Sequence, residues 1–177
     1  MKSTKYLLIF ILALSVLSCN KNDDDGGSTT FLLSTENLAG THALTFLTVD
    51  VEETQEVNGI PVTSTITAVG STFQVEMIFR VDGTYSIEGQ YLLTTTVTVA
   101  GQTETDTEII VLDEGGTYSL DANDQTIFVS GSGGELGSGT FDITVFNETD
   151  FRFVQTQVIT ANGISGDIIS EYRFERL

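Results

Sequence analysis

Apolar and polar residues alternate along most of the chain after residue 38, which is the pattern of β-strands that bury one face and expose the other. The run from 73 to 81 is the clearest case, because every odd position is apolar and Gln74, Glu76 and Arg80 lie between them. No segment of helical length repeats its apolar residues every three to four positions. The pattern therefore predicts an all-β domain.

Short turn sequences divide these alternating runs. Asp82-Gly83 predicts a two-residue type I′ hairpin, since both residues accept positive φ angles, and Ala100-Gly101 predicts the next turn. A Gly/Ser-rich segment at 130–139 is expected to be a loop, and residues 113–116 a further turn. The turns leave nine or ten antiparallel strands, near residues 41–51, 62–69, 73–81, 85–99, 103–111, 117–120, 126–130, 140–146, 151–160 and 167–174.

The two longest of these strands form one hairpin around Ala100-Gly101. On the first, the odd positions from 85 to 99 share one face. On the second, threonines at odd positions alternate with acidic residues at even positions. We expect the outward face of this hairpin to carry threonine and acid, at Thr94, Thr96, Thr98, Glu104, Asp106 and Glu108.

Hairpins about every 10 to 15 residues, with no helix to cover an open sheet, favour a closed sheet, because closure removes exposed strand edges. We therefore expect an antiparallel up-and-down β-barrel of about 8–10 strands. A β-sandwich of two packed sheets is the alternative, since alternation alone does not distinguish one closed sheet from two facing ones.

The N-terminal residues 1–18 have the composition of a signal peptide, with two lysines followed by an apolar run too short to span a bilayer. The run ends in Val16-Leu17-Ser18-Cys19, which resembles a bacterial lipobox. Cys19 is the only cysteine of the chain, so no intrachain disulfide can form. We expect Cys19 to be lipidated and to anchor the protein to a membrane.

An acidic segment follows the cysteine and resembles the export signal of surface-displayed lipoproteins. Its charged residues are Lys21, Asp23, Asp24 and Asp25. The resemblance implies an outer-membrane lipoprotein that is exposed at the cell surface, and the alternative is a tether that faces the periplasm. We expect residues 19–37 to be the lipidated cysteine and a Gly/Ser/Thr linker, and residues 38–177 to be the barrel domain.

The composition excludes several functions. A net charge of -18 repels phosphate backbones, so nucleic acid is not an expected partner. His42 is the single histidine, so any Ser-His-Asp relay would depend on it, and a packed strand residue is the better interpretation. The chain shows no cysteine cluster, calcium loop or phosphate-binding glycine motif. We expect no enzyme activity, no cofactor and no bound metal.

Several short motifs resemble the lipocalin-like domains of bacterial surface lipoproteins. They are Leu38-Ala-Gly-Thr-His42, Phe79-Arg-Val-Asp-Gly-Thr-Tyr85, Gly115-Gly-Thr-Tyr-Ser-Leu120, Asn147-Glu-Thr-Asp-Phe151 and Tyr172-Arg-Phe-Glu-Arg176, and together they cover nearly the whole domain. His42 stands where the family has a tryptophan, which packs at the closed base of the barrel under a basic residue of the last strand.

The resemblance implies that inward apolar residues line a cavity for a small hydrophobic ligand. The alternative is that the same side chains fill the core, and that the protein is a scaffold whose loops bind a glycan or a protein partner. The residues expected to point inward are Phe73, Val75, Met77, Phe79, Tyr85, Ile87, Tyr91, Phe151, Phe153, Tyr172 and Phe174.

Overall fold

The computed structural model describes residues 31–131, 138–161 and 164–177, which belong to one compact unit, Phe31–Leu177. The sequence predictions for residues 1–18, for Cys19 and for Lys21, Asp23, Asp24 and Asp25 lie outside the described residues. Most of the Gly/Ser-rich segment, at 132–137, lies outside them as well.

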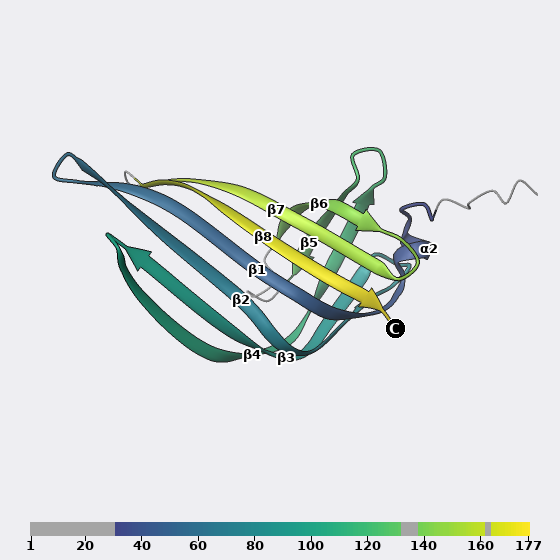
Figure 1. Ribbon diagram of the computed structural model, residues 1–177. Helices are drawn as coiled ribbons and strands as arrows, with labels where there is room; N and C mark the ends of the chain where they lie inside the picture. The colour runs from purple at the N-terminus through teal and green to yellow at the C-terminus, as the bar shows by residue number, and fades with distance from the viewer. Residues whose placement is uncertain (1–30, 132–137, 162–163) are drawn as a thin grey trace, which may run out of the picture. The chain divides into compact units, whose positions relative to one another are not determined.

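The described residues form eight antiparallel strands in a single closed barrel (Figure 1). Each strand pairs with its neighbours along the chain, and β1 pairs with β8 to close the ring. This up-and-down order confirms the predicted all-β barrel, and a single ring stands in place of the two sheets of a sandwich. The elements are α2 (Thr35–Leu38), β1 (Gly40–Val57), β2 (Ile60–Phe79), β3 (Thr84–Val99), β4 (Gln102–Asp121), β5 (Thr126–Gly131), β6 (Gly139–Phe146), β7 (Asp150–Ala161) and β8 (Ile164–Arg176).

Several strands are longer than the sequence indicated, and two of them run through predicted breaks. β2 continues through residues 70–72, where a bulge shifts its register with β3 between Ser71 and Gln74 without ending the strand. β4 continues through residues 113–116, so the predicted turn there is wrong. A Cβ atom on Gly116 would lie 2.1 Å from the carbonyl oxygen of Ser130 on β5, so this glycine serves a close approach of two strands rather than a turn.

The connection between β2 and β3 is a hairpin, but its loop is wider than predicted. Residues 80–83 join the strands, and of these only Gly83 has a positive φ angle, +81°. A type I′ turn needs positive φ at both central residues, so the predicted two-residue turn at Asp82-Gly83 is wrong. The Thr84 N–H donates to the Asp82 carboxylate at 3.0 Å, and the Arg80 N–H donates to the Thr84 carbonyl at 2.9 Å, which hold the wider loop.

Two other hairpins have two-residue turns. Ala100 and Gly101 join β3 to β4 with φ angles of +50° and +81°, which confirms the predicted turn. Asn58 and Gly59 join β1 to β2 with φ angles of +55° and +79°. The second turn was not predicted, although Asn-Gly is a strong hairpin sequence.

The buried apolar side chains come from α2 and from the parts of the strands next to it, at the end of the barrel where Figure 1 labels α2 and the C-terminus. Phe153 is fully buried there, and its ring centre lies 4.9 Å from that of Phe141 and 5.0 Å from that of Tyr172. Edge-to-face and tilted ring pairs at these separations stabilise beyond the area that they bury. The buried apolar residues are Leu33, Leu38, Leu44, Leu47, Val75, Met77, Phe79, Tyr85, Ile87, Tyr91, Leu112, Tyr118, Ile127, Val129, Phe141, Ile143, Phe151, Phe153, Tyr172 and Phe174.

Residues just before the barrel close its base. Phe31 lies with its ring centre 5.0 Å from that of Phe146, and Leu33 and Leu38 are buried, so part of the segment expected as linker packs on the barrel. Arg176, at the end of β8, donates to the carbonyl oxygen of Ala39 at 2.7 Å and also to that of Asn37. Arg176 therefore links the end of β8 to the segment that leads into β1.

Six strands continue beyond the core, whereas β5 and β6 are short. β4 pairs with β5 only over Gly116–Asp121, and β7 pairs with β6 only as far as Val154. We call the continuation of β7, β8, β1, β2, β3 and β4 beyond the core the distal sheet. Among the described residues, no strand pairs with the outer edges of β4 and β7 in this sheet.

The acidic residues of β4 face the inside of the distal sheet, which corrects the predicted outward orientation. Glu104 lies opposite Val97, Asp106 opposite Thr95 and Glu108 opposite Leu93. Directly opposite residues point to the same side of an antiparallel pair, and these β3 residues continue the face that carries buried Tyr85, Ile87 and Tyr91. The threonines form the outward face, as predicted for Thr94, Thr96 and Thr98, with hydroxyl pairs at Thr94–Thr107, Thr96–Thr105 and Thr98–Thr103.

Candidate functional site

The residues predicted to line a cavity lie in the filled half of the barrel. Phe73 is half-buried, and the other ten are buried. A space next to four of them, lined by Leu44, Leu47, Ile87, Tyr91, Leu112, Tyr172 and Phe174, has a volume of about 10 Å³. A single water needs roughly 10–15 Å³ of such space, so this region has no room for a ligand.

A much larger pocket opens in the wall of the barrel, where β1 and β2 separate. The two strands pair at Ala43↔Glu76 and again at Thr48↔Val69, and the residues between these positions do not pair. The pocket has a volume of about 710 Å³, within the range of roughly 300–1,000 Å³ that is typical of small-molecule sites. We call it the wall pocket, and it is lined by Ala43, Leu44, Phe73, Gln74, Val75, Glu76, Glu88, Gly89 and Leu177.

The lining of the wall pocket is amphipathic. Leu44 and Val75 expose only 4% and 3% of their surface, so they form its dry part together with the half-buried ring of Phe73. Glu76 and Glu88 lie directly opposite each other on β2 and β3, and both are exposed. The pocket therefore offers an apolar surface beside a negatively charged one.

Unusual backbone conformations produce this opening. Thr72, in the β2 bulge, has a φ angle of +53°, which is rare for a β-branched residue. Gly89, on β3, has a φ angle of +125°, and a Cβ atom there would lie 1.9 Å from the carbonyl oxygen of Gln74. Bulges and strained residues are concentrated at functional sites in proteins, so these positions make the wall pocket a stronger candidate for a functional site.

The ring of Phe73 is held in the lining by its neighbours. Its centre lies 5.9 Å from that of Tyr91, and the ring covers Gly70, where a Cβ atom would lie 2.7 Å from it. Phe73 is thus the one residue of the predicted cavity lining that is both partly exposed and part of the wall pocket.

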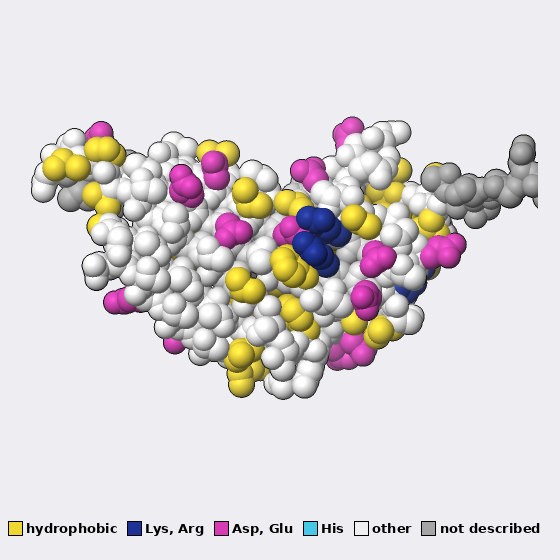
Figure 2. Space-filling model, viewed as in Figure 1, with side chains coloured by type: hydrophobic (Ala, Val, Ile, Leu, Met, Phe, Trp, Pro, Cys, Tyr) yellow, Lys and Arg dark blue, Asp and Glu magenta, His cyan; other side chains and the backbone are white. Residues whose placement is uncertain are grey.

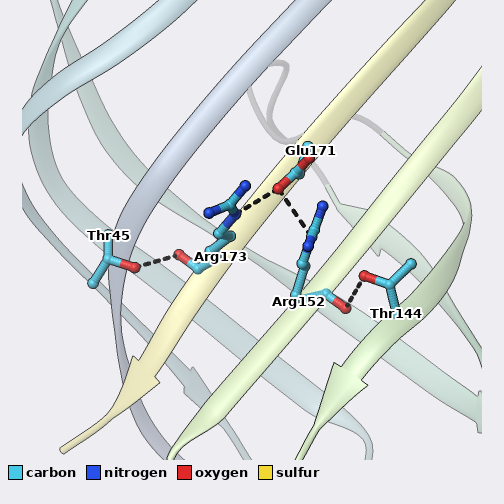
Figure 3. A network of polar contacts seen from close by, with 5 residues as sticks. All are labelled: Thr45, Thr144, Arg152, Glu171 and Arg173. Atoms are coloured by element: carbon cyan, nitrogen blue, oxygen red, sulfur yellow. Dashed lines mark hydrogen bonds and ion pairs between the residues drawn. The ribbon is translucent and has the colours of Figure 1, made fainter.

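A second polar feature lies on the outer face of β7 and β8. Figure 2 shows dark-blue basic side chains gathered near the centre of this face, among scattered acidic ones. Figure 3 shows the network: Arg152 and Arg173 both contact the Glu171 carboxylate, with Arg152 Nε 2.9 Å from Oε1. The guanidinium of Arg173 also lies 4.1 Å from the ring centre of Phe46 on β1.

This network ties neighbouring strands together. Burial raises the pKa of the Glu171 carboxyl, but the hydrogen bonds and charges of the two arginines outweigh burial and hold that pKa below its usual value. Thr45 and Thr144 donate to the carbonyl oxygens of Arg173 and Arg152, which links β1 and β6 to the same place (Figure 3). Because both guanidinium groups contact Glu171, the network links β7 to β8 on the outer face and is not an open anion site.

His42 lies at the base of the barrel and is buried, as expected for a packed strand residue. Its Nε2 lies 2.9 Å from the carbonyl oxygen of Leu38, and its ring packs edge-on against Phe79 at 5.6 Å. Burial lowers the pKa of His42, the charge of Arg176 lowers it further, and the Leu38 carbonyl opposes both. His42 is therefore neutral near pH 7 and donates from Nε2, and its Nδ1 has no hydrogen-bond partner among the described residues.

Within the described ranges, no three His, Cys, Asp or Glu side chains lie close enough together to hold a metal ion. No helix in the part of the chain that the structure describes is long and apolar enough to cross a membrane.

A comparison of the chain with protein-family models, curated proteins and solved structures found no match in any of the three. The function is therefore inferred from the sequence and from the geometry of this molecule.

Proposed function

We propose that the protein is a lipid-anchored lipoprotein of the outer membrane, of lipocalin-like type, that binds a small, mainly apolar ligand. The lipid on Cys19 holds it at the membrane, and Lys21 with Asp23, Asp24 and Asp25 directs it to the cell surface. A periplasm-facing orientation with the same anchor is the alternative.

The wall pocket is the observation that carries the ligand-binding part of this proposal. Its volume of about 710 Å³ compares with about 10 Å³ for the space between Leu44, Tyr91 and Tyr172 in the core, and this difference supports the wall pocket as the ligand site. Leu44, Phe73 and Val75 would contact the apolar part of the ligand. Glu76 and Glu88 favour a ligand whose polar end is neutral or positively charged.

We propose no catalytic role for the protein. His42, the single histidine, has its Nε2 at the Leu38 carbonyl and is enclosed by aromatic rings. This arrangement supports a structural role, because a general base must reach the proton that it abstracts.

The membrane anchor is tested by replacing its cysteine. We expect Cys19→Ala to abolish acylation, so that the protein leaves the membrane fraction and becomes soluble, because a domain of this acidity has little affinity for anionic lipid. Cell fractionation with mass analysis of the N-terminal peptide measures both effects. Ser28→Ala, in the linker outside the lipobox, is the control and should remain bound, and membrane retention of Cys19→Ala would contradict the proposed anchor.

The ligand is tested first by mass. The protein released by Cys19→Ala is purified from its own cells, and its native mass is compared with its denatured mass. We expect a difference that corresponds to a small apolar molecule, or else uptake of a fluorescent probe with an aliphatic chain and an uncharged polar end by the empty protein. Equal masses together with no uptake of the probe would contradict ligand binding.

Paired variants test whether the probe binds in the wall pocket. Phe73→Ala removes a ring of the lining, and we expect binding of the probe to weaken about tenfold, since the loss of one aromatic contact costs roughly 1–2 kcal/mol. Phe128→Ala is the control, because Phe128 is 48% exposed and does not line the pocket. Equal affinities of the two variants would place the probe elsewhere.

The filled interior also favours the second function considered for this chain, a scaffold that binds a partner through its surface. The core half of the interior is occupied by its own side chains, so recognition of a macromolecule would take place on the outside or at a strand edge.

A further inference from the structure

The outer edge of β4 is a long row of backbone groups without a partner strand among the described residues. β4 pairs with β3 from Thr84↔Thr117 to Val99↔Gln102, but with β5 only over Gly116–Asp121. Between residues 102 and 112, no other described strand pairs with this edge. Such an edge is a ready template for a further strand, and natural proteins usually cover or shorten it.

The two faces of this edge strand differ in chemistry. On the inner face, Glu104, Asp106 and Glu108 follow one another at every second position and are all exposed. On the outer face, Ile109 and Val111 expose 65% and 69% of their surface. A strand that pairs here would therefore meet a row of negative charges on one face and exposed aliphatic side chains on the other.

This charge pattern disfavours a second copy of the chain as the partner. Antiparallel pairing of two β4 edges about Asp106 would place this residue opposite its own copy and Glu104 opposite Glu108, and like charges that lie directly opposite are destabilising. The N-terminal segment 20–30 is also disfavoured, because it carries Asp23, Asp24 and Asp25 and only one lysine.

We propose that the β4 edge binds an extended segment of a partner protein in which Lys or Arg occupies every second position. Three basic side chains of the segment pair with Glu104, Asp106 and Glu108, and its backbone continues the sheet. Aliphatic residues at one end of the segment cover Ile109, Ile110 and Val111. This inference is independent of the wall pocket, which involves β1, β2 and β3.

The register of β4 defines a probe peptide. In antiparallel pairing, the peptide Val-Ile-Val-Lys-Thr-Lys-Thr-Lys places its first residue opposite Val111 and its last lysine opposite Glu104. Its affinity for the full chain carrying Cys19→Ala is measured by calorimetry, and amide exchange shows where it binds. We expect binding that protects amides of residues 102–112.

Two substitution sets separate this edge from general attraction to an acidic protein. Glu104→Gln, Asp106→Asn and Glu108→Gln together should weaken binding of the peptide about tenfold, since each opposite-charge cross-strand pair contributes a small factor. Asp50→Asn, Glu52→Gln and Asp167→Asn remove the same charge from β1 and β8, away from the β4 edge, and should change the affinity less than about twofold.

Methylated peptides test the backbone hydrogen bonds. In an antiparallel pair, every second residue directs its N–H toward a given neighbour. Two versions of the peptide, N-methylated at odd or at even positions, carry the same charges. We expect one version to lose binding to the β4 edge by about tenfold or more and the other to retain it.

Three results would overturn the proposal. They are a lack of binding of the lysine peptide, equal binding of both methylated versions, and equal effects of the two substitution sets. Sedimentation of the protein alone tests the second-copy alternative. A concentration-dependent dimer that becomes tighter with Glu104→Gln, Asp106→Asn and Glu108→Gln, which remove the repulsion between the two copies, would show that the edge is a self-association surface instead.

Discussion

Replacing Gly89 by alanine is expected to destabilise the barrel by about 4 kcal/mol, one of the largest effects of any single substitution in the chain. Two costs combine at this position. The φ angle of +125° is one that residues with a Cβ atom rarely adopt, and the new Cβ would lie 1.9 Å from the carbonyl oxygen of Gln74. Neither β2 nor β3 can move away without breaking the ladder at Val75↔Gly89.

The measurement is the thermal midpoint of the full chain carrying Cys19→Ala, followed by far-UV circular dichroism. We expect the midpoint of Gly89→Ala to fall by about 10 °C or more. Because Gly89 and its partner Val75 line the wall pocket, uptake of the fluorescent probe should fall as well.

Two further glycines separate the causes. Gly101 has a φ angle of +81°, and a Cβ atom there would meet no other atom within 4 Å, so Gly101→Ala tests the backbone angle alone. Gly116 has an ordinary φ angle, but its Cβ would lie 2.1 Å from the Ser130 carbonyl oxygen, so Gly116→Ala tests the collision alone. If Gly89→Ala proves no worse than Gly101→Ala, the close approach of β2 and β3 is not what requires the glycine.

The all-β barrel was predictable because alternation, turns and the lack of helical periodicity all indicate the same architecture. The strand count was less predictable, since the sequence alone does not distinguish a glycine inside a strand from a glycine in a turn. Gly116 illustrates the difficulty: it permits contact between β4 and β5, and only the position of Ser130 shows this.

The orientation of the β4 acids could have been derived from the sequence. A two-residue turn at Ala100-Gly101 places Val99 opposite Gln102 and therefore Val97 opposite Glu104. Since the odd positions of β3 face inward, the even positions of β4 must face inward too. An outward orientation is the usual expectation for charged side chains, and here the acids remain exposed because the edge of β4 has no partner among the described residues.

The wall pocket was beyond sequence analysis. Its existence depends on the loss of pairing between Ala43↔Glu76 and Thr48↔Val69, and on a positive φ angle at Thr72, which no residue preference predicts. The only available signal was Gly70 and Gly89 inside alternating runs, because an isolated glycine in a strand often marks a bulge. The alternation predicts an inward position for Phe73, and the partial exposure of its ring follows from that bulge.

The half-filled barrel has a physical consequence for where recognition occurs. Aromatic packing at one end stabilises the fold, while the distal sheet keeps two strand edges with which no described strand pairs. Charge on the β4 edge prevents indiscriminate pairing, because a strand without basic residues would leave three carboxylates partly desolvated. In our proposal, aromatic packing at one end stabilises the fold, and the edge of β4 at the other end binds the partner segment.

Truncating Phe153 is the second change expected to have a large effect. Its side chain has no exposed surface, and its ring contacts those of Phe141, Phe151, Tyr172 and Phe174 at centre separations of 4.9 to 5.6 Å. Phe153→Ala leaves a cavity among rigid rings that cannot collapse into it, so we expect a loss of about 3–5 kcal/mol. This is a large part of the roughly 5–15 kcal/mol by which a domain is usually stable.

Urea denaturation followed by circular dichroism measures this loss, since the chain has no tryptophan for fluorescence. We expect the midpoint of Phe153→Ala to fall by about 2 M, because the unfolding slope of a domain of this size is about 2 kcal/mol per M. Phe128→Ala makes the same chemical change at a residue that is 48% exposed, and should lower the midpoint by less than about 0.5 M. Similar midpoints for the two variants would mean that the rings around Phe153 repack, and that the core is less rigid than its ring geometry indicates.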